Sequence, residues 1–232
     1  MKIAGSTALV TGANRGFGRA LAAELIARGA TVYAGARDPS SVDLPGAIPV
    51  ALDITDPASI AAAVQATGDV TLLVNNAGSA PQADLLTGDL DTIRGEFDVH
   101  VFGTLAVTRA FAPQIAANGG GAVLNILSVL SWLSFPHYGA YSAAKSASWS
   151  VTNALRAQLA GDGIRVAGLH VGFMDTDMVA GVDAPKADPA DIARIAVDGI
   201  EADLAEIVAD ETSRQVQAGL AGGVAALYPA LA

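Results

Sequence analysis

Short runs of apolar, largely β-branched residues alternate with longer helix-like segments along this chain, and this alternation limits the possible folds more than any other feature. The expected strands cover residues 6–11, 31–35, 48–52, 71–75, 122–127, 164–170 and 205–209. The expected helices cover residues 18–28, 57–67, 91–117, 141–161 and 189–201. Nearly continuous apolar strands are typical of a parallel sheet covered on both faces. The pattern predicts a doubly wound α/β fold with about seven parallel strands and helices on both faces.

The composition favours a single cytoplasmic domain over residues 1–232. Apolar residues make up 52% of the chain and charged residues 16%, which is enough to bury a sizeable core. No internal repeat, signal peptide or uninterrupted apolar run of about 18 residues is seen. The chain has no cysteine, so neither disulfides nor thiolate zinc sites are expected, and we expect no other metal. A net charge of −10 argues against nucleic acid as a partner.

A glycine-rich loop joins the first expected strand to the first expected helix. Its sequence is Thr11-Gly12-Ala13-Asn14-Arg15-Gly16-Phe17-Gly18. Gly12 permits a tight turn, Gly16 lets the backbone approach a pyrophosphate, and Gly18 allows close helix–strand packing. The helix N-terminus offers free N–H groups and the positive end of a dipole to phosphates. An ordinary tight turn is the alternative, but the position of the loop favours a nucleotide site.

Three residues separate the first two glycines, and this Thr-Gly-x-x-x-Gly-x-Gly spacing resembles that of the short-chain dehydrogenase/reductase family. Three further motifs follow in the family's order: Asn75-Asn76-Ala77-Gly78, Ser128, and Tyr141-Ser142-Ala143-Ala144-Lys145, whose tyrosine lies thirteen residues after the serine. The resemblance covers about residues 6–178. It implies a Rossmann-type domain that binds NAD(P), with the glycine-rich loop, including Asn14 and Phe17, and the Asn76-Ala77-Gly78 segment against the cofactor.

The choice between NADH and NADPH depends on the end of the second strand. The resemblance implies an acid there in NAD-using proteins, whereas this chain has Ala36 followed by Arg37, with Arg15 in the glycine-rich loop. Two guanidinium groups can hold a 2′-phosphate by charge-assisted bonds that a hydroxyl cannot replace. Asp38 lies near the interval of a ribose-binding acid, but the second strand should end before it. We expect NADP(H) to be preferred over NAD(H).

The resemblance also assigns residues at both ends of the cofactor. It implies that Asp53-Ile54 lies at the adenine, with Asp53 accepting from the amino group. Helix capping is the alternative for Asp53, although Thr55 or Asp56 can cap the helix that begins near residue 57. Val171-Gly172 stands where the family has Pro-Gly, so a looser turn is expected. Thr176 falls where the family's threonine meets the nicotinamide carboxamide.

Tyr141, Lys145 and Ser128 have the chemistry for proton transfer to a carbonyl oxygen. Lowering a tyrosine pKa from about 10 to about 7 takes about 4 kcal/mol, which an ammonium about 4 Å away supplies at an effective dielectric near 20. Residues four apart share a helix face, so Lys145 is expected beside Tyr141. Ser128 would hold and polarise the substrate oxygen. Most Tyr/Lys pairs with this spacing are surface accidents, but this pair follows the other motifs in order. Two nearby residues do not fit the pattern: Tyr138 has no lysine four residues later, and Ser131 is not thirteen residues before Tyr141.

His100 departs from the family's pattern, because relatives usually have an asparagine there that anchors a water of the proton relay. We expect neutral His100 to hold the same water, with a packing histidine as the alternative. The nearby Lys145 ammonium should lower the pKa of His100 below its free value of about 6.5.

The sequence therefore predicts an NADPH-dependent ketoreductase or hydroxy-compound dehydrogenase that acts on a small carbonyl or alcohol. Trp132, Leu133, Phe135 and Phe173 suggest an apolar substrate, although such side chains also suit a core. Two alternatives stay open: a catalytically silent NADP-sensing module, and epimerase or dehydratase chemistry on the same scaffold. The resemblance implies a homodimer or homotetramer packed through the helices after strands four and five. One short helix is expected after the seventh strand.

Overall fold

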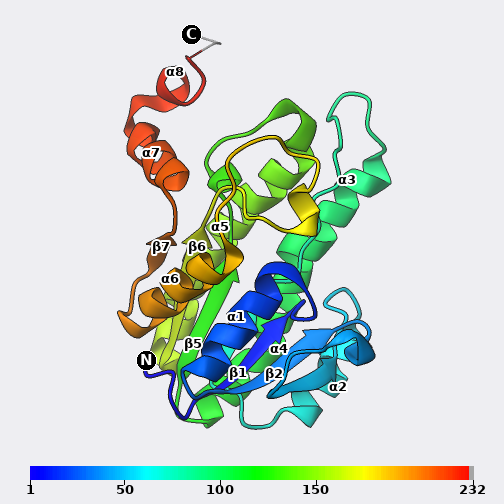
Figure 1. Cartoon of the computed structure of the whole chain (residues 1–232), viewed down its shortest axis with the longest axis vertical. Helices are drawn as coiled ribbons and strands as arrows, with labels where there is room; N and C mark the ends of the chain where they lie inside the picture. The colour runs from blue at the N-terminus through cyan, green and yellow to red at the C-terminus, as the bar shows by residue number, and fades with distance from the viewer. Residues whose placement is uncertain (230–232) are drawn as a thin grey trace.

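One parallel sheet of seven strands lies at the centre of the computed structural model, which describes residues 1–229 (Figure 1). The strands are β1 (Thr7–Thr11), β2 (Thr31–Ala36), β3 (Ala47–Ala51), β4 (Leu72–Asn75), β5 (Gly121–Ile126), β6 (Ile164–His170) and β7 (Glu206–Val208). Their order across the sheet is β3-β2-β1-β4-β5-β6-β7. The order reverses between β1 and β4, and sheets of this kind bind ligands beyond the carboxyl ends of the strands at that point. The predicted fold class is confirmed.

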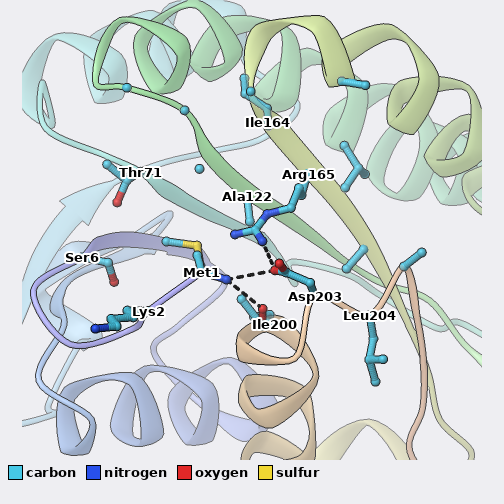
Figure 2. A pocket seen from close by; sticks show the side chains of 18 of the residues that line it. Met1, Lys2, Ser6, Thr71, Ala122, Ile164, Arg165, Ile200, Asp203 and Leu204 are labelled. Atoms are coloured by element: carbon cyan, nitrogen blue, oxygen red, sulfur yellow. Dashed lines mark hydrogen bonds and ion pairs between the residues drawn. The ribbon is translucent and has the colours of Figure 1, made fainter.

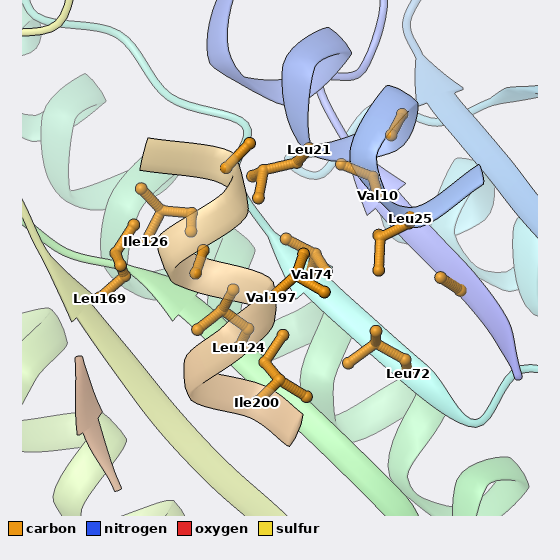
Figure 3. Packing of buried hydrophobic residues seen from close by; sticks show 14 of the residues in the cluster. Val10, Leu21, Leu25, Leu72, Val74, Leu124, Ile126, Leu169, Val197 and Ile200 are labelled. Carbon is orange, nitrogen blue, oxygen red and sulfur yellow. The ribbon is translucent and has the colours of Figure 1, made fainter. Parts of the chain in front are cut away.

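Helices cover both faces of the sheet because the strand residues alternate between two apolar clusters. One cluster contains Val74 and packs under α1 (Gly16–Ala27) and α6 (Pro189–Glu201), as Figure 3 shows. The other contains Leu73 and packs under three helices: α2 (Pro57–Ala66), α4 (Thr104–Ala117) and α5 (Gly139–Leu159). Neighbouring residues of one strand thus face opposite clusters, which is why the strands are apolar without a polar alternate.

The helix predicted over residues 91–117 is interrupted. It begins as α3 (Leu90–Phe97), passes through a π-helical segment η2 (Asp98–Gly103), and continues as α4. Within η2, His100 is 3% exposed, whereas Phe102 is 59% exposed. π-Helical turns occur often at functional sites, because the wider turn re-aims a side chain.

Two helices, rather than the one that was predicted, follow β7. They are α7 (Glu211–Gly219) and α8 (Gly223–Leu227), drawn in red in Figure 1. Gly223 adopts a φ of 65°, a left-handed conformation that separates the two helices. After α8, the Tyr228 hydroxyl accepts a hydrogen bond from the Ser134 N–H at 2.7 Å, which ties this region to the loop before α5.

None of the helices in the described part of the chain has the length and apolar character needed to cross a membrane.

A cavity of about 750 Å³ opens at the amino ends of the strands (Figure 2). Asp203 bridges two cations beside it, the Met1 ammonium at 3.0 Å and the Arg165 guanidinium. None of the residues that the sequence predicts for the site lines this cavity. The predicted residues lie at the carboxyl ends of the strands instead, so the two features are separate.

Candidate active site

The glycine-rich loop forms a tight cradle before α1. Gly12 and Gly16 adopt φ values of 65° and 54°, which favour glycine. A Cβ at Gly18 would overlap the Gly12 carbonyl oxygen and the Asn76 side-chain amide, so the backbone packs closely there. Arg15 is the N-cap of α1, and no side chain caps the helix. The first N–H groups of α1 therefore remain available to an anion.

Substituting Gly18 is expected to damage the fold as well as the cradle. We expect Gly18→Ala to lower the free energy of unfolding by about 1–3 kcal/mol, because the added methyl group overpacks a fixed backbone. Gly95→Ala is the matched control: Gly95 is also helical, but its Cβ would meet nothing within 4 Å. Urea unfolding of both variants checks this, and equal stabilities would contradict it.

The Asn76-Ala77-Gly78 segment is tied to the end of β1. The Asn76 side-chain amide donates to the Thr11 and Gly12 carbonyl oxygens at 2.9 and 3.2 Å. The Thr11 hydroxyl oxygen accepts from the N–H groups of Asn76 and Ala77, each at 2.9 Å. These bonds hold the segment across the switch point between β1 and β4, beside the glycine cradle.

The two arginines predicted for a 2′-phosphate are both exposed. Arg37 directly follows β2, and the Arg15 guanidinium lies 3.2 Å from the Asp177 carboxylate. An exposed pair of this kind is weak, about 0–1 kcal/mol, so Arg15 can exchange partners. Asp38 lies outside β2, and its carboxylate accepts from the Ser40 N–H and hydroxyl, which lowers its pKa. The structure thus places Asp38 beyond the strand, as the sequence suggested.

Asn14 and Asp53 are held by local hydrogen bonds. The Asn14 amide donates to the Ser41 hydroxyl at 3.1 Å, joining the glycine-rich loop to the turn after β2. Asp53 accepts from the N–H and hydroxyl of Thr55, which lowers the pKa of its carboxyl group. The N-cap of α2 is Asp56, so Asp53 does not cap that helix. The other residues predicted at the cofactor include three with buried side chains: Phe17, Ile54 and Val171.

Ser128, Tyr141 and Lys145 come together at the carboxyl ends of the strands. Ser128 lies two residues beyond β5, is 6% exposed, and accepts from the Leu130 N–H at 3.1 Å. Tyr141 and Lys145 both lie in the first two turns of α5. The Lys145 ammonium donates to the Ile126 carbonyl oxygen at 2.7 Å and lies 5.6 Å from the centre of the Tyr141 ring.

The electrostatics differ from the sequence-based expectation. Burial raises the pKa of Tyr141 to about 12, and the Ser128 hydroxyl opposes this only in part. Burial also lowers the pKa of Lys145 to about 8. The structure therefore does not show the expected drop of the Tyr141 pKa toward 7, because removing the phenolate from water outweighs the Ser128 hydrogen bond and the negative charge of Glu96 adds to the rise.

His100 lies within the same cluster. Its ring meets the Tyr141 ring edge to face, with centroids 5.2 Å apart. Its Nε2 lies 2.7 Å from the Ser79 carbonyl oxygen and 3.5 Å from a Glu96 carboxylate oxygen. Burial first, and the Lys145 charge second, lower the pKa of His100. The direction agrees with the expectation, but burial rather than Lys145 is the main cause.

Glu96 was missed by the sequence reasoning. It is 1% exposed, and the Ser79 hydroxyl donates to it at 2.6 Å. Its spacing of four residues before His100 was the available signal, since such residues share a helix face. Two possible metal ligands thus lie together, yet within residues 1–229 no group of three or more His, Asp or Glu could hold a metal ion.

A second buried histidine, His170, contacts Ser128 and Trp132. His170, at the end of β6, stacks on Trp132 with ring centroids 3.7 Å apart. Its Nδ1 lies 3.2 Å from the Ser128 carbonyl oxygen, and burial lowers its pKa to about 4. Trp132, 7% exposed, therefore belongs to the core, whereas Phe135 is 43% exposed. Of the apolar residues suggested for a substrate pocket, Trp132 is thus a packing residue.

Two hydrogen bonds from distant segments hold the turn after β6. The Gly172 N–H donates to the Asp210 carboxylate at 2.5 Å, and the Val129 N–H donates to the Val171 carbonyl oxygen at 2.9 Å. These bonds hold the turn at two points in the absence of a proline. Thr176 lies next to the glycine-rich loop, since a Cβ at Gly16 would be 3.6 Å from its Cγ2.

Known proteins resemble the chain across this site. A family model described as short chain dehydrogenase matches residues 6–187. Dehydrogenase/reductase SDR family protein 7-like of Anopheles gambiae is 32% identical over 190 residues, which cover 74% of this chain and only 60% of that protein. Sorbitol dehydrogenase of Cereibacter sphaeroides is 34% identical over 205 residues, or 84% of this chain and 80% of that protein. A solved short chain dehydrogenase of Burkholderia cenocepacia J2315, in complex with NADP, is 36% identical with a TM-score of 0.95, over 100% of this chain and 99% of that one.

Proposed function

The chain belongs to the short chain dehydrogenase family of oxidoreductases, and from that premise we propose that it is an NADPH-dependent ketoreductase or hydroxy-compound dehydrogenase. Its substrate is a small carbonyl or alcohol compound. The observation that carries the proposal is the meeting of Ser128, Tyr141 and Lys145 beside the glycine cradle. No single one of these residues indicates the reaction, but together they supply a hydrogen-bond donor, a proton and a fixed positive charge.

The residues present fit a nicotinamide dinucleotide. The close packing at Gly18 holds the start of α1 against the glycine-rich loop, and the uncapped first turn of α1 leaves free N–H donors for a pyrophosphate. Arg15 and Arg37 would hold a 2′-phosphate, Asp53 the adenine, and Thr176 the carboxamide. When bound, the cofactor supplies the electron pair that reduces the carbonyl carbon.

The protein's own residues orient the substrate and move the proton. The Ser128 oxygen accepts from the Leu130 N–H, and its hydroxyl also bonds to the Tyr141 phenol. With substrate bound, the Ser128 hydroxyl would donate to the substrate oxygen and polarise it. With a pKa of about 12, Tyr141 is protonated at neutral pH and donates its proton as that oxygen gains negative charge. The Lys145 ammonium stabilises the phenolate and binds the cofactor ribose. Neutral His100 holds a water that returns a proton to the pair.

A panel of ketones and alcohols, assayed with both cofactors, tests this function. We expect NADPH oxidation that depends on a ketone. Tight NADPH binding without turnover of any substrate would favour the silent NADP-sensing module instead. Product formation without net cofactor oxidation would favour the epimerase or dehydratase chemistry.

NADPH is expected to bind at least tenfold more tightly than NADH, which corresponds to about 1.4 kcal/mol. The reason is that charge-assisted bonds from Arg15 and Arg37 need a phosphate partner. Replacing Ala36 with Asp and Arg37 with Ser should shift the preference toward NADH. Arg94→Ser, which removes an exposed arginine from α3, should leave it unchanged. Fluorescence titration of the parent and both variants with NADPH and NADH measures the six dissociation constants, and equal constants for the two cofactors in the parent protein would contradict the proposal.

We further propose that the chain is one catalytic domain and works in the cytoplasm as a homodimer or homotetramer. All seven strands belong to one sheet, which supports a single domain. The oligomer would pack through α4 and α5, whose small side chains allow close helix contact. Light scattering coupled to size exclusion tests the oligomeric state.

A further inference from the structure

Within residues 1–229, one carboxylate is buried, and it lies beside His100. Glu96 is the only Asp or Glu among the buried described residues, and Lys145 is the only buried Lys or Arg. The two flank His100, one from α3 and one from α5. Burying a carboxylate is costly unless it is paired and hydrogen-bonded. The contacts of Glu96 therefore indicate what the charge does.

The two carboxylate oxygens of Glu96 face Ser79 and His100. One carboxylate oxygen accepts from the Ser79 hydroxyl at 2.6 Å, and the other lies 3.5 Å from the His100 Nε2. The same Nε2 lies 2.7 Å from the Ser79 carbonyl oxygen, which can only accept. The Ser79 N–H also lies 3.4 Å from Nε2, but the much shorter contact with the carbonyl oxygen favours Nε2 as the donor when the imidazole is neutral, which leaves Nδ1 as an acceptor.

His100 in turn contacts Tyr141 of the proposed reaction site and the Asn76-Ala77-Gly78 segment. Its ring meets the Tyr141 ring edge to face, at an interplanar angle of 88°. On another side it fills the space at Gly78, where a Cβ would come within 2.7 Å of the His100 Cε1. The imidazole is thus fixed between the Asn76-Ala77-Gly78 segment and α5, with little freedom to turn.

We propose that Glu96 is a positioning residue of the reaction site. Its buried carboxylate, acting with Ser79, fixes His100 in the Nε2–H tautomer and keeps Lys145 charged beside Tyr141. This inference rests on the proposed function, because it assigns Glu96 a task in that reaction.

Packing alone does not account for Glu96. The carboxylate oxygen that faces His100 is buried and has no hydrogen-bond partner, so an apolar side chain would fill the place with less desolvation. The charged and titratable groups that act on this site are Glu96, His100, Tyr141 and Lys145, and His170 on β6 also interacts with the Lys145 charge. Burial lowers the pKa of both Lys145 and His100, and the negative charge of Glu96 partly restores both values.

The pH dependence of NADPH binding and turnover tests the proposal. We expect Glu96→Gln to move the basic limb of both profiles to lower pH by about one unit, because Lys145 loses its opposite charge. At pH 6, where Lys145 is charged in either protein, the NADPH dissociation constant should stay within about twofold of the parent value. Glu96→Asp should largely restore the parent profile. Asp91→Asn removes an exposed charge from the same helix and should change nothing.

Superimposable profiles for the parent and Glu96→Gln would overturn the inference. That outcome would leave the proposed function intact, whereas full turnover in Tyr141→Phe would overturn the function itself. If Glu96→Gln fails to fold, nitrogen NMR of the parent tests the tautomer that the proposal assigns to His100. The chain has only three histidines, and His100→Asn identifies the signal of His100 by its loss. An Nε2–H signal for His100 supports the proposal, and an Nδ1–H signal contradicts it.

Discussion

Replacing Tyr141 with phenylalanine is expected to lower turnover by about 10²–10⁴-fold, the usual contribution of a positioned proton donor. The substitution removes only the hydroxyl group, so the ring can keep its edge-to-face contact with His100. NADPH binding should therefore change little. Single-turnover measurements at saturating NADPH, together with fluorescence titration of the cofactor, separate the two effects.

Tyr138→Phe is the matched control for this substitution. Tyr138 lies three residues earlier, and its hydroxyl accepts only a weak hydrogen bond from Gln82 at 3.4 Å. Its removal should cost less than about threefold, since weak exposed contacts contribute little. Near-normal turnover in Tyr141→Phe, with a substrate that the parent reduces, would show that another group supplies the proton.

The strands were predictable because each is a short apolar run with strong local preference. Residues 164–170 agree with β6 at both ends, and the other six strands differ by one residue, three of them at one end and three at both ends. The interruption of the helix at η2 was not predictable. Nothing in residues 98–103 marks an interruption, and the π-helical turn lies where the chain packs against α3 and α5.

The candidate site was predictable in its residues but not in its electrostatics. Motif spacing predicted that Tyr141 and Lys145 lie together, which follows from helix geometry. The direction of the Tyr141 pKa depends on how much protein covers the phenol, and spacing carries no information on that. The same reason hid Glu96 and His170, whose importance comes from burial of polar groups by segments distant in sequence. The role of Asp210 could not be predicted either, because Asp210 follows β7 and is 38 residues away in sequence from Gly172, whose N–H it accepts.

Lys145→Ala is expected to impair both cofactor binding and turnover, because one ammonium serves two partners. Losing a preorganised charge at a reaction site lowers turnover by about 10²–10³-fold.

The pKa of Lys145 in the structure adds a pH dependence of turnover. A lysine with a pKa of about 8 is charged below that value and neutral above it, so turnover of the parent should fall as pH rises from 7 to 9. Lys186→Ala, an exchange of a lysine outside the site, should keep the parent profile. Turnover of the parent against pH at saturating NADPH measures this limb, and the unfolding transition of Lys145→Ala shows whether the variant remains folded. A flat profile up to pH 10 would contradict the expected loss of turnover as Lys145 loses its proton near pH 8.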